Sequence, residues 1–261
     1  MTGPSVTGPG ATGPGAIDLS VVIPAYNEAG RIGPTLHRLL ATLERLPLPW
    51  EIVVADDGSA DDTAAIVAAV SAREPRVRCL RLPHRGKGAA VRDGLLAAQG
   101  GRRFLCDADL AMPPAQITRF LAVLPSQCDI AIGSREGTGA VRVGEPLRRH
   151  LLGRVFNMLV RAMVLPGIQD TQCGFKLFTA AAAEAVLPTT AIEGWAFDVE
   201  LLASARAQGW RVLEVPIEWH FGQASKLRVV PHSIQMLRDL YRVRAKVRRG
   251  AFTRRPSVPH S

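Results

Sequence analysis

The chain has 261 residues, a net charge of +9 and 47% hydrophobic residues, which is enough to bury one sizeable core. No stretch approaches the roughly 18 uncharged apolar residues of a membrane-spanning helix. The amino terminus lacks the basic start and the apolar core of a secretory signal, so we expect a single-domain cytoplasmic protein.

Residues 1–17 form a Gly/Pro-rich repeat with a period of five. This composition cannot bury apolar area, so we expect a disordered tail that precedes a folded domain over residues 18–230. The four cysteines of the chain are widely spaced and form no C-x-x-C pair. We expect them to be reduced core residues rather than zinc or redox ligands.

Apolar runs alternate with helical patterns from residue 19 to about residue 132. Strands joined by helices form right-handed crossovers, so this alternation predicts an α/β fold with a mostly parallel sheet flanked by helices. The expected strands lie at 19–23, 51–55, 77–82, 102–106 and 128–132, and the expected helices at 28–45, 61–72, 87–99 and 114–124.

Three of these strands run directly into acidic residues. The segments that follow them are Pro24-Ala25-Tyr26-Asn27-Glu28, Asp56-Asp57-Gly58-Ser59 and Asp107-Ala108-Asp109. Parallel strands end at one edge of the sheet, which is where open α/β sheets bind ligands. Asp56 and Asp57 could instead cap the next helix, and Glu28 could be an ordinary first-turn acid.

Asp107 and Asp109 are candidate metal ligands. Side chains at i and i+2 of an extended segment share a face, so both carboxylates can bind the same cation. Mg²⁺ or Mn²⁺ suits such hard oxygen ligands and would stabilise a leaving nucleoside diphosphate. A solvated pair of strand-end acids is the alternative reading. Arg85-Gly86-Lys87-Gly88 is not a P-loop, but its glycines would let backbone approach a ligand that Lys87 could reach.

After residue 132 the alternation breaks, and residues 134–149 predict a mobile polar loop rich in glycine and arginine. The planar guanidinium group of arginine binds two phosphate oxygens at once, so Arg135 and Arg149 are candidates for binding a phosphate group. A solvated basic loop is the alternative. The remaining expected elements are a helix at 150–165, a strand at 174–178, a helix at 196–208, a strand-like segment at 211–219 and a helix at 232–249.

The expected helix at 150–165 has one polar face, formed by His150, Arg154, Asn157 and Arg161. It could be a core helix with this face in water. It could also lie partly in a lipid interface and guide a lipid chain.

The motifs SVVIPAYNE, VVADDGSADDT, RGKGAAVRDGL, DADL, GSR, DTQCGFKLF and WAFDVELL follow in this order. Over residues 18–230 the chain therefore resembles the inverting family 2 glycosyltransferases with the GT-A fold. DTQCGFKLF and WAFDVELL resemble the dolichyl-phosphate β-glucosyltransferase group and its polyprenyl-phosphate relatives.

The resemblance implies a nucleotide-sugar site in which Asp56 or Asp57 accepts from uracil, while Pro24, Ala25, Tyr26 and Glu28 line the base and ribose. It implies that Asp107, Ala108 and Asp109 hold the metal-bound diphosphate, near Lys87. Lys176 and Lys226 are further candidates for phosphate binding. One departure is Gln223-Ala224-Ser225-Lys226-Leu227, where the relatives carry Gly-Ser-Lys-Leu.

Asp198 corresponds to the acid that serves as a base in family members that act on hydroxyl groups. A phosphate monoester is already largely ionised at neutral pH, because its second pKa is near 6, and needs basic side chains more than a base. Asp198 could then orient the sugar or an arginine. His220 could be a third metal ligand or an ordinary strand-end histidine.

Residues 226–261 hold ten Lys or Arg and one Asp, whereas the rest of the chain is neutral. This basic end over residues 231–261 predicts contact with a polyanion, either an anionic membrane surface or nucleic acid. Clustered acids in the core and the lack of a nucleic-acid motif argue against a non-enzymatic nucleic-acid binder.

The sequence therefore favours an enzyme peripheral to the inner membrane face, which moves glucose from UDP-glucose onto a polyprenyl or dolichyl phosphate. GDP-mannose as donor and a soluble acceptor are the alternatives.

Overall fold

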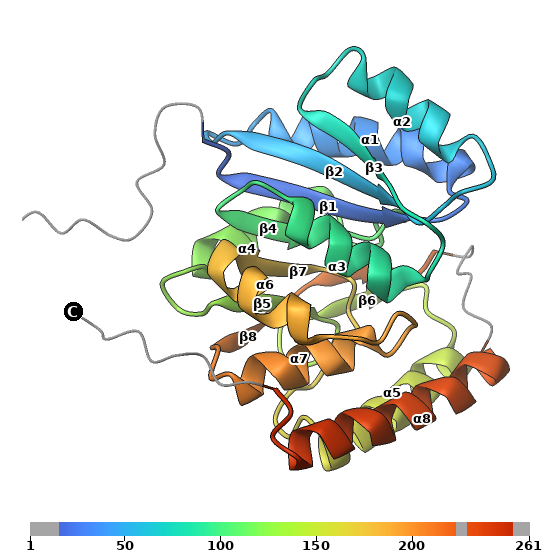
Figure 1. Cartoon of the computed structure of the whole chain (residues 1–261), viewed down its shortest axis with the longest axis vertical. Coiled ribbons are helices and arrows are strands. Elements are labelled where there is room, and N and C mark those ends of the chain that lie inside the picture. The colour runs from blue at the N-terminus through green and yellow to red at the C-terminus, as the bar shows by residue number, and fades with distance from the viewer. Residues whose placement is uncertain (1–15, 223–228, 253–261) are drawn as a thin grey trace, which may run out of the picture.

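The computed structural model describes residues 16–222 and 229–252 and has a seven-stranded sheet with helices on both faces (Figure 1). The strand order is β3-β2-β1-β4-β7-β5-β8, and β7 runs antiparallel to both of its neighbours. The strands are β1 (Leu19–Ala25), β2 (Trp50–Asp56), β3 (Val77–Arg81), β4 (Arg102–Leu105), β5 (Ile130–Ser134), β7 (Lys176–Thr179) and β8 (Val212–Pro216). The predicted α/β fold with a mostly parallel sheet is confirmed.

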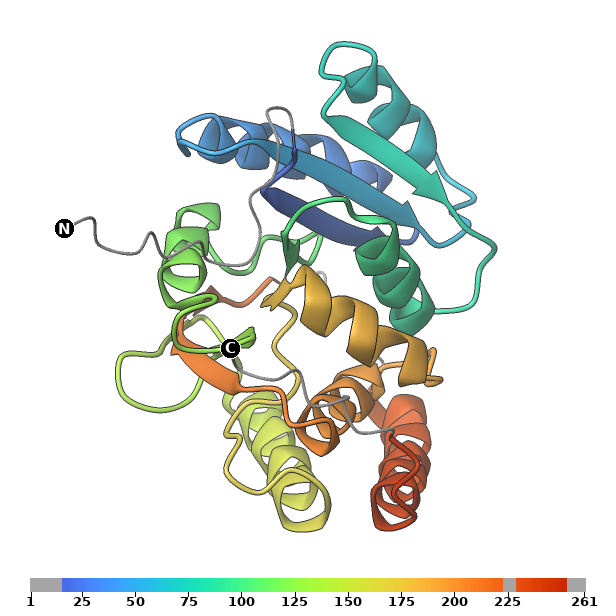
Figure 2. The same cartoon turned by 60° about the vertical axis from the view of Figure 1, so that its left-hand side comes forward.

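Each face of the sheet packs against its own set of helices. The first face is covered by α1 (Ala29–Leu43), α2 (Thr63–Ser71) and α4 (Ile117–Val123), and the second by α3 (Lys87–Ala97), α6 (Ala180–Val186) and α7 (Phe197–Ala207). Outside α7 lie α5 (Leu147–Met163) and α8 (Val229–Arg248), side by side in both views (Figures 1 and 2). One-turn helices at Pro114–Gln116 and Leu187–Thr189 complete the elements around α4 and α6.

The two-sided cover explains why the strands read as continuous apolar runs. Every residue of β1 and β2 is buried, because one side chain faces α1 and the next faces α3. The register pairs Ala25 with Asp56 and Val22 with Leu105. The acidic segments after these three strands therefore leave the sheet together at its carboxyl edge.

The segment at 134–149 differs from the predicted mobile loop. It contains β6 (Val141–Val143), which pairs with β9 (Glu218–His220) in a separate two-stranded sheet, and α5 begins at Leu147. The expected strand at 211–219 is accordingly two strands, because its second half leaves the main sheet to pair with β6. Glycine and arginine content could not reveal this pairing, since the partner lies far away in the sequence.

The cysteines match the expectation. All four are free thiols; Cys79 is partly buried and Cys106, Cys128 and Cys173 are buried. Of the predicted tail, residues 1–15 lie outside the described residues, as does Lys226. Within the described ranges, no helix is both long and apolar enough to cross a membrane.

Candidate active site

A cavity of about 680 Å³ opens at the carboxyl edge of the sheet and extends to α5. Most of the predicted site residues line it. They are Pro24, Ala25, Tyr26, Glu28, Asp57, Lys87, Asp107, Ala108, Asp109, Arg135 and Asp198. Asp56 and Lys176 lie beneath the surface instead. Arg149 lies in α5, but its side chain is outside the described part of the structure.

Asp57 is held at one end of the cavity by the turn that follows β3. Its carboxylate accepts from the backbone N–H groups of Arg85 and Gly86, each at 2.9 Å. Nδ1 of His84 lies 2.8 Å from Asp57 Oδ2, and the His84 ring stacks on Tyr26 with the centroids 4.1 Å apart. A carboxylate beside a flat aromatic surface provides hydrogen bonding and stacking for a planar base.

Asp56 has a different environment from Asp57. It is fully buried, and its Oδ1 accepts from the backbone N–H and the hydroxyl of Ser59. Among the described residues, Asp56 Oδ2 has no hydrogen-bond partner. Helix α2 begins later, with Asp62 at its N-cap position, so neither Asp56 nor Asp57 caps it. Of the two acids, Asp57 is the one that faces the cavity.

Asp107 lies between a lysine and a glycine. Its Oδ1 is 2.7 Å from Nζ of Lys87. A Cβ on Gly174 would lie only 1.8 Å from Asp107 Oδ2, so the glycine is needed to make room for this carboxylate. Burial opposes the charged form of Lys87, but the carboxylates of Asp107 and Asp198 outweigh it and raise its pKa. Lys87 is therefore cationic at neutral pH.

The glycines beside Lys87 serve the protein's own packing. A Cβ on Gly88 would lie 2.5 Å from the Ile192 carbonyl oxygen, and one on Gly86 would lie 2.6 Å from that of Glu193. The Gly88 N–H also donates to the Glu193 carbonyl at 2.7 Å. Gly86 also lines the cavity, so a ligand can still approach its backbone, whereas Gly88 is not among the lining residues.

Asp109 is the second acid of the pair. Its Oδ1 accepts from the Ala111 N–H at 3.1 Å. Burial raises the pKa of Asp109, and the nearby charge of Asp107 raises it further. A bound divalent cation would remove this repulsion, and Mg²⁺ or Mn²⁺ commonly binds one or two carboxylates together with substrate phosphates. Asp107 and Asp109 therefore fit a metal site.

His220, the possible third ligand, has a partner of its own, since its Nε2 lies 2.7 Å from Glu218 Oε1. The described residues contain no group of three His, Cys, Asp or Glu side chains placed to hold a metal. A cation at Asp107 and Asp109 would therefore need oxygen ligands from substrate and water.

Asp198 lies in the first turn of α7, and Lys176 reaches it from below. Nζ of Lys176 is 2.6 Å from Asp198 Oδ1 and also donates to the Cys173 carbonyl. Burial raises the pKa of Asp198 in spite of this cation. Lys176 is fully buried and does not line the cavity, so its predicted role at the acceptor phosphate is revised. It is the counter-ion of Asp198.

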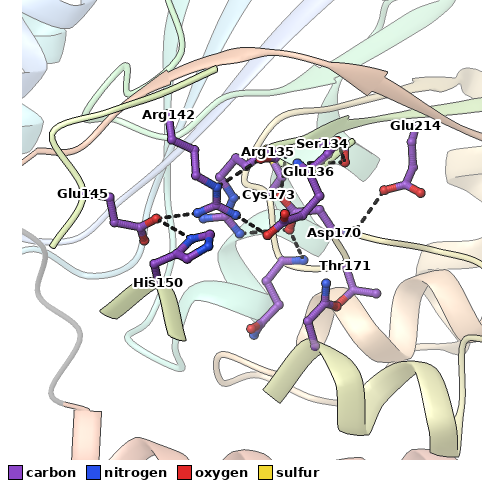
Figure 3. A network of polar contacts seen from close by, with 12 residues as sticks. Ser134, Arg135, Glu136, Arg142, Glu145, His150, Asp170, Thr171, Cys173 and Glu214 are labelled. Atoms are coloured by element: carbon purple, nitrogen blue, oxygen red, sulfur yellow. Dashed lines mark hydrogen bonds and ion pairs between the residues drawn. The ribbon is translucent and has the colours of Figure 1, made fainter. Parts of the chain in front are cut away.

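Arg135 is held in a bidentate ion pair at the far end of the cavity (Figure 3). Its Nε and Nη2 donate to the two oxygens of Asp170, at 2.7 and 2.9 Å. Asp170 also accepts from the Arg135 backbone N–H. Burial disfavours the charge of Asp170, but Arg135 outweighs it and lowers the pKa of this carboxyl. The predicted phosphate ligand Arg135 thus already has a carboxylate partner.

A second group of charges lies beside this pair. Arg142 of β6 binds Glu136 through Nη2 and Glu145 through Nη1, at 2.7 and 2.5 Å. Nδ1 of His150, on α5, lies 3.3 Å from the same Glu145 oxygen. All four side chains line the cavity. Figure 3 shows how this group and the Arg135–Asp170 pair lie next to each other.

Several side chains that line the cavity are not among the residues predicted from the sequence. They are His84, Glu136, Glu145, Trp195 and Trp219. His84 had a usable signal, because it follows the strand at 77–82 and so lies at the same sheet edge as the acids. Glu145 had a signal too, because its partner Arg142 lies only three residues before it in the sequence.

The glycosyl transferase family 2 model matches residues 20–187. The chain is 38% identical to a dolichyl-phosphate beta-glucosyltransferase of Trichomonas vaginalis over 89% of this chain and 72% of the relative. It is 36% identical to the dolichyl-phosphate beta-glucosyltransferase of Saccharomyces cerevisiae over 90% of this chain and 77% of the relative.

The fold also resembles solved structures. Glucosyl-3-phosphoglycerate synthase of Mycobacterium tuberculosis, solved with Mn²⁺, UDP and its glucosylated product, superposes with a TM-score of 0.66 at 17% identity, over 89% of this chain and 80% of that one. Mannosyl-3-phosphoglycerate synthase of Rubrobacter xylanophilus superposes with a TM-score of 0.64 at 17% identity, over 94% of this chain and 78% of that one. These likenesses establish a GT-A-like fold.

Proposed function

The chain belongs to glycosyltransferase family 2, and on that premise we propose that it transfers glucose from UDP-glucose to a polyprenyl or dolichyl phosphate. The observation that carries this proposal is the division of one cavity into two halves. One half holds Asp57, Asp107 and Asp109 at the sheet edge, and the other holds Arg135 and Arg142. A nucleotide-sugar suits the first half, and an anionic acceptor suits the second.

In the donor half, Asp57 would accept the uracil N–H while the base lies against Tyr26. Lys87 binds Asp107 in the absence of a ligand, and its flexible ammonium group would also bind the diphosphate, because both are anions within its reach. Asp107 and Asp109 would hold Mg²⁺ or Mn²⁺, which supplies Lewis-acid stabilisation of the leaving diphosphate.

The transfer itself is an in-line displacement. An oxygen of the acceptor phosphate forms the new bond to the anomeric carbon, and the bond from that carbon to the diphosphate breaks. UDP leaves with the bonding electron pair, and the configuration inverts. The acceptor is already ionised, so no base is needed. We therefore assign Asp198, held by Lys176, to orienting the sugar.

On the acceptor side, Arg135, Arg149 and Lys226 remain candidates for the phosphate. Arg135 lines the cavity and would contribute through the guanidinium N–H groups that do not bind Asp170, since only its Nε and Nη2 donate to that carboxylate. We place the enzyme at the cytoplasmic face of the membrane, where a polyprenyl tail would remain in the lipid.

A donor and acceptor screen tests the proposal. The purified chain is incubated with Mg²⁺ or Mn²⁺, polyprenyl phosphate in vesicles, and radiolabelled UDP-glucose, UDP-galactose or GDP-mannose. We expect label in the organic phase with UDP-glucose, and none when the free polyprenol replaces its phosphate. EDTA should abolish the transfer.

Two other results would identify the alternatives. Label from GDP-mannose alone would make the chain a mannosyltransferase. Label that stays in the aqueous phase with a soluble phosphate monoester would indicate a soluble acceptor. Either result contradicts the proposed donor or acceptor.

A further inference from the structure

The two arginines of the acceptor half are held in different ways. The Arg135–Asp170 pair is built into the fold, because Asp170 is buried and accepts from both the side chain and the backbone of Arg135. The Asp170 N–H in turn donates to Glu214 at 2.8 Å. Breaking such a pair leaves a buried charge unpaired, so it stays intact when a ligand enters.

Arg142 and His150 share one carboxylate, that of Glu145, while Arg142 is also bound by Glu136. A single oxygen of Glu145, Oε2, lies 2.5 Å from Arg142 Nη1 and 3.3 Å from His150 Nδ1. All three residues line the cavity, and Glu145 follows Gly144, which has a φ of +76° and open space around its Cβ position. The Glu145 side chain is only 8% exposed, but it borders the cavity, so an entering anion can reach the oxygen that Arg142 and His150 share.

One anionic oxygen shared by a guanidinium and an imidazole is the arrangement that a phosphate monoester would adopt there. Carboxylate and phosphate oxygens are both acceptors, and arginine binds either one in the same fork geometry. The Glu145 carboxylate thus lies where an entering phosphate group would bind. Both anions cannot share it, because two like charges in contact repel each other.

We propose that Glu145 is a built-in occupant of an anion site formed by Arg142 and His150, and that the acceptor phosphate binds by displacing it. This inference rests on the proposed function, since it specifies how that acceptor is chosen. A phosphate dianion has the charge to replace the Glu145 carboxylate, whereas a neutral prenyl alcohol does not. Glu145 then makes the site selective for phosphorylated acceptors, at the expense of some affinity for them.

The experiment measures binding, so that it does not depend on turnover. Geranyl phosphate, a water-soluble prenyl phosphate, is titrated by calorimetry into the UDP-bound protein with Mn²⁺. Glu145→Gln keeps the shape of the side chain and removes its charge. We expect geranyl phosphate to bind this variant about tenfold more tightly than wild type, as for the release of one charge-assisted hydrogen bond. The affinity for UDP should not change.

A matched control separates this effect from a general change in charge. Glu218 is also a glutamate bound to a histidine, on β9, but it is exposed and does not line the cavity. Glu218→Gln removes the same charge and should leave the affinity for geranyl phosphate within about twofold of wild type.

The background variant Arg142→Gln completes the test. If Glu145 competes for Arg142, Glu145→Gln should tighten binding much less in this background than in wild type. Equal tightening in both backgrounds, or no tightening in wild type, overturns the inference while the proposed acceptor stands. If geranyl phosphate binds none of the variants and polyprenyl phosphate is not glycosylated, the proposed acceptor fails and the inference fails with it.

Discussion

Asp109 is an acid of the site whose charge is opposed both by burial and by a neighbouring carboxylate. Burial raises its pKa, and the neighbouring charge of Asp107 raises it further, so its ionised form is disfavoured in the metal-free fold. Asp107, by contrast, has the ammonium group of Lys87 within 2.7 Å. The two acids of one motif therefore differ. Asp107 forms an ion pair with Lys87, whereas the charge of Asp109 would be stabilised by a bound cation.

We predict that Asp109→Asn abolishes transfer and stabilises the metal-free protein. The amide removes an unfavourable buried charge. A gain of about 1 kcal/mol in the free energy of unfolding raises the Tm by about 2–4 °C in a chain of this size. It also weakens a site for a hard cation. Differential scanning calorimetry in EDTA and a transfer assay measure the two effects. A lower Tm together with wild-type turnover would contradict both roles.

Lys176 shows how a buried cation can serve a neighbouring carboxylate. It is fully buried, and its partner Asp198 is almost fully buried too. Removing one partner of such a pair leaves the other charge without compensation. The pair therefore ties β7 to the start of α7 directly beneath the cavity.

We predict that Lys176→Met destabilises the protein by about 3–5 kcal/mol, the usual effect of breaking a buried ion pair. The double variant Lys176→Met/Asp198→Leu should recover most of that loss, because it removes both charges. Urea unfolding curves measure the free energies of unfolding. If the single and double variants lose the same stability, the ion pair is not the cause.

At the scale of elements, α5 presents two different faces. His150, Gly153 and Asn157 line the cavity. The most exposed face is apolar, with Leu147 at 82% and Leu151 at 63% of their full exposure; Val155 and Met158 continue it. The expectation of a core helix with a polar face in water is therefore confirmed only in part. Arg154 and Arg161 are exposed as expected, but His150 and Asn157 line the cavity, and the apolar side chains named above are exposed within the described structure.

We predict that this apolar stripe, defined by Leu147, Leu151, Val155 and Met158, contacts lipid. Leu147→Glu/Leu151→Glu should reduce binding to uncharged phosphatidylcholine vesicles by at least about tenfold, since each buried leucine contributes about 1.5–3 kcal/mol. Ala41→Glu/Ala72→Glu adds the same charge at exposed positions near α1 and α2 and should have no effect. Vesicle flotation gives the readout. Equal loss in both variants would exclude a specific role for the stripe.

At the scale of the whole molecule, the positive charge gathers at one end. Helix α8 is anchored to the domain, because Leu240 and Val243 are buried and Lys246 Nζ lies 2.5 Å from Glu200. Its outer side exposes arginines next to α5, at the opposite end from α2 and β3 (Figure 1). Deleting α8 would therefore damage the core, and only its exposed charges can be tested cleanly.

We predict that Arg238→Gln/Arg248→Gln/Arg249→Gln weakens binding to anionic vesicles on the order of 100-fold at low salt, at about 1 kcal/mol for each charge. High salt should weaken the binding of wild type in the same way. The matched control exchanges the exposed Arg45, Arg73 and Arg81 for glutamine at the far end of the molecule. Co-sedimentation that falls equally in both triple variants would show a general effect of charge rather than an oriented surface.

The sequence by itself determined the α/β fold, the edge of the sheet where the site lies, and the acids that line it. These follow from local rules, since apolar runs make buried strands and parallel strands end at one edge. Only the tertiary structure decided which charges meet. Lys176 pairs with Asp198, and Arg135 with Asp170, because segments that are distant in the sequence become neighbours in the fold. An ion pair depends on distance in space, and spacing along the chain does not supply that distance.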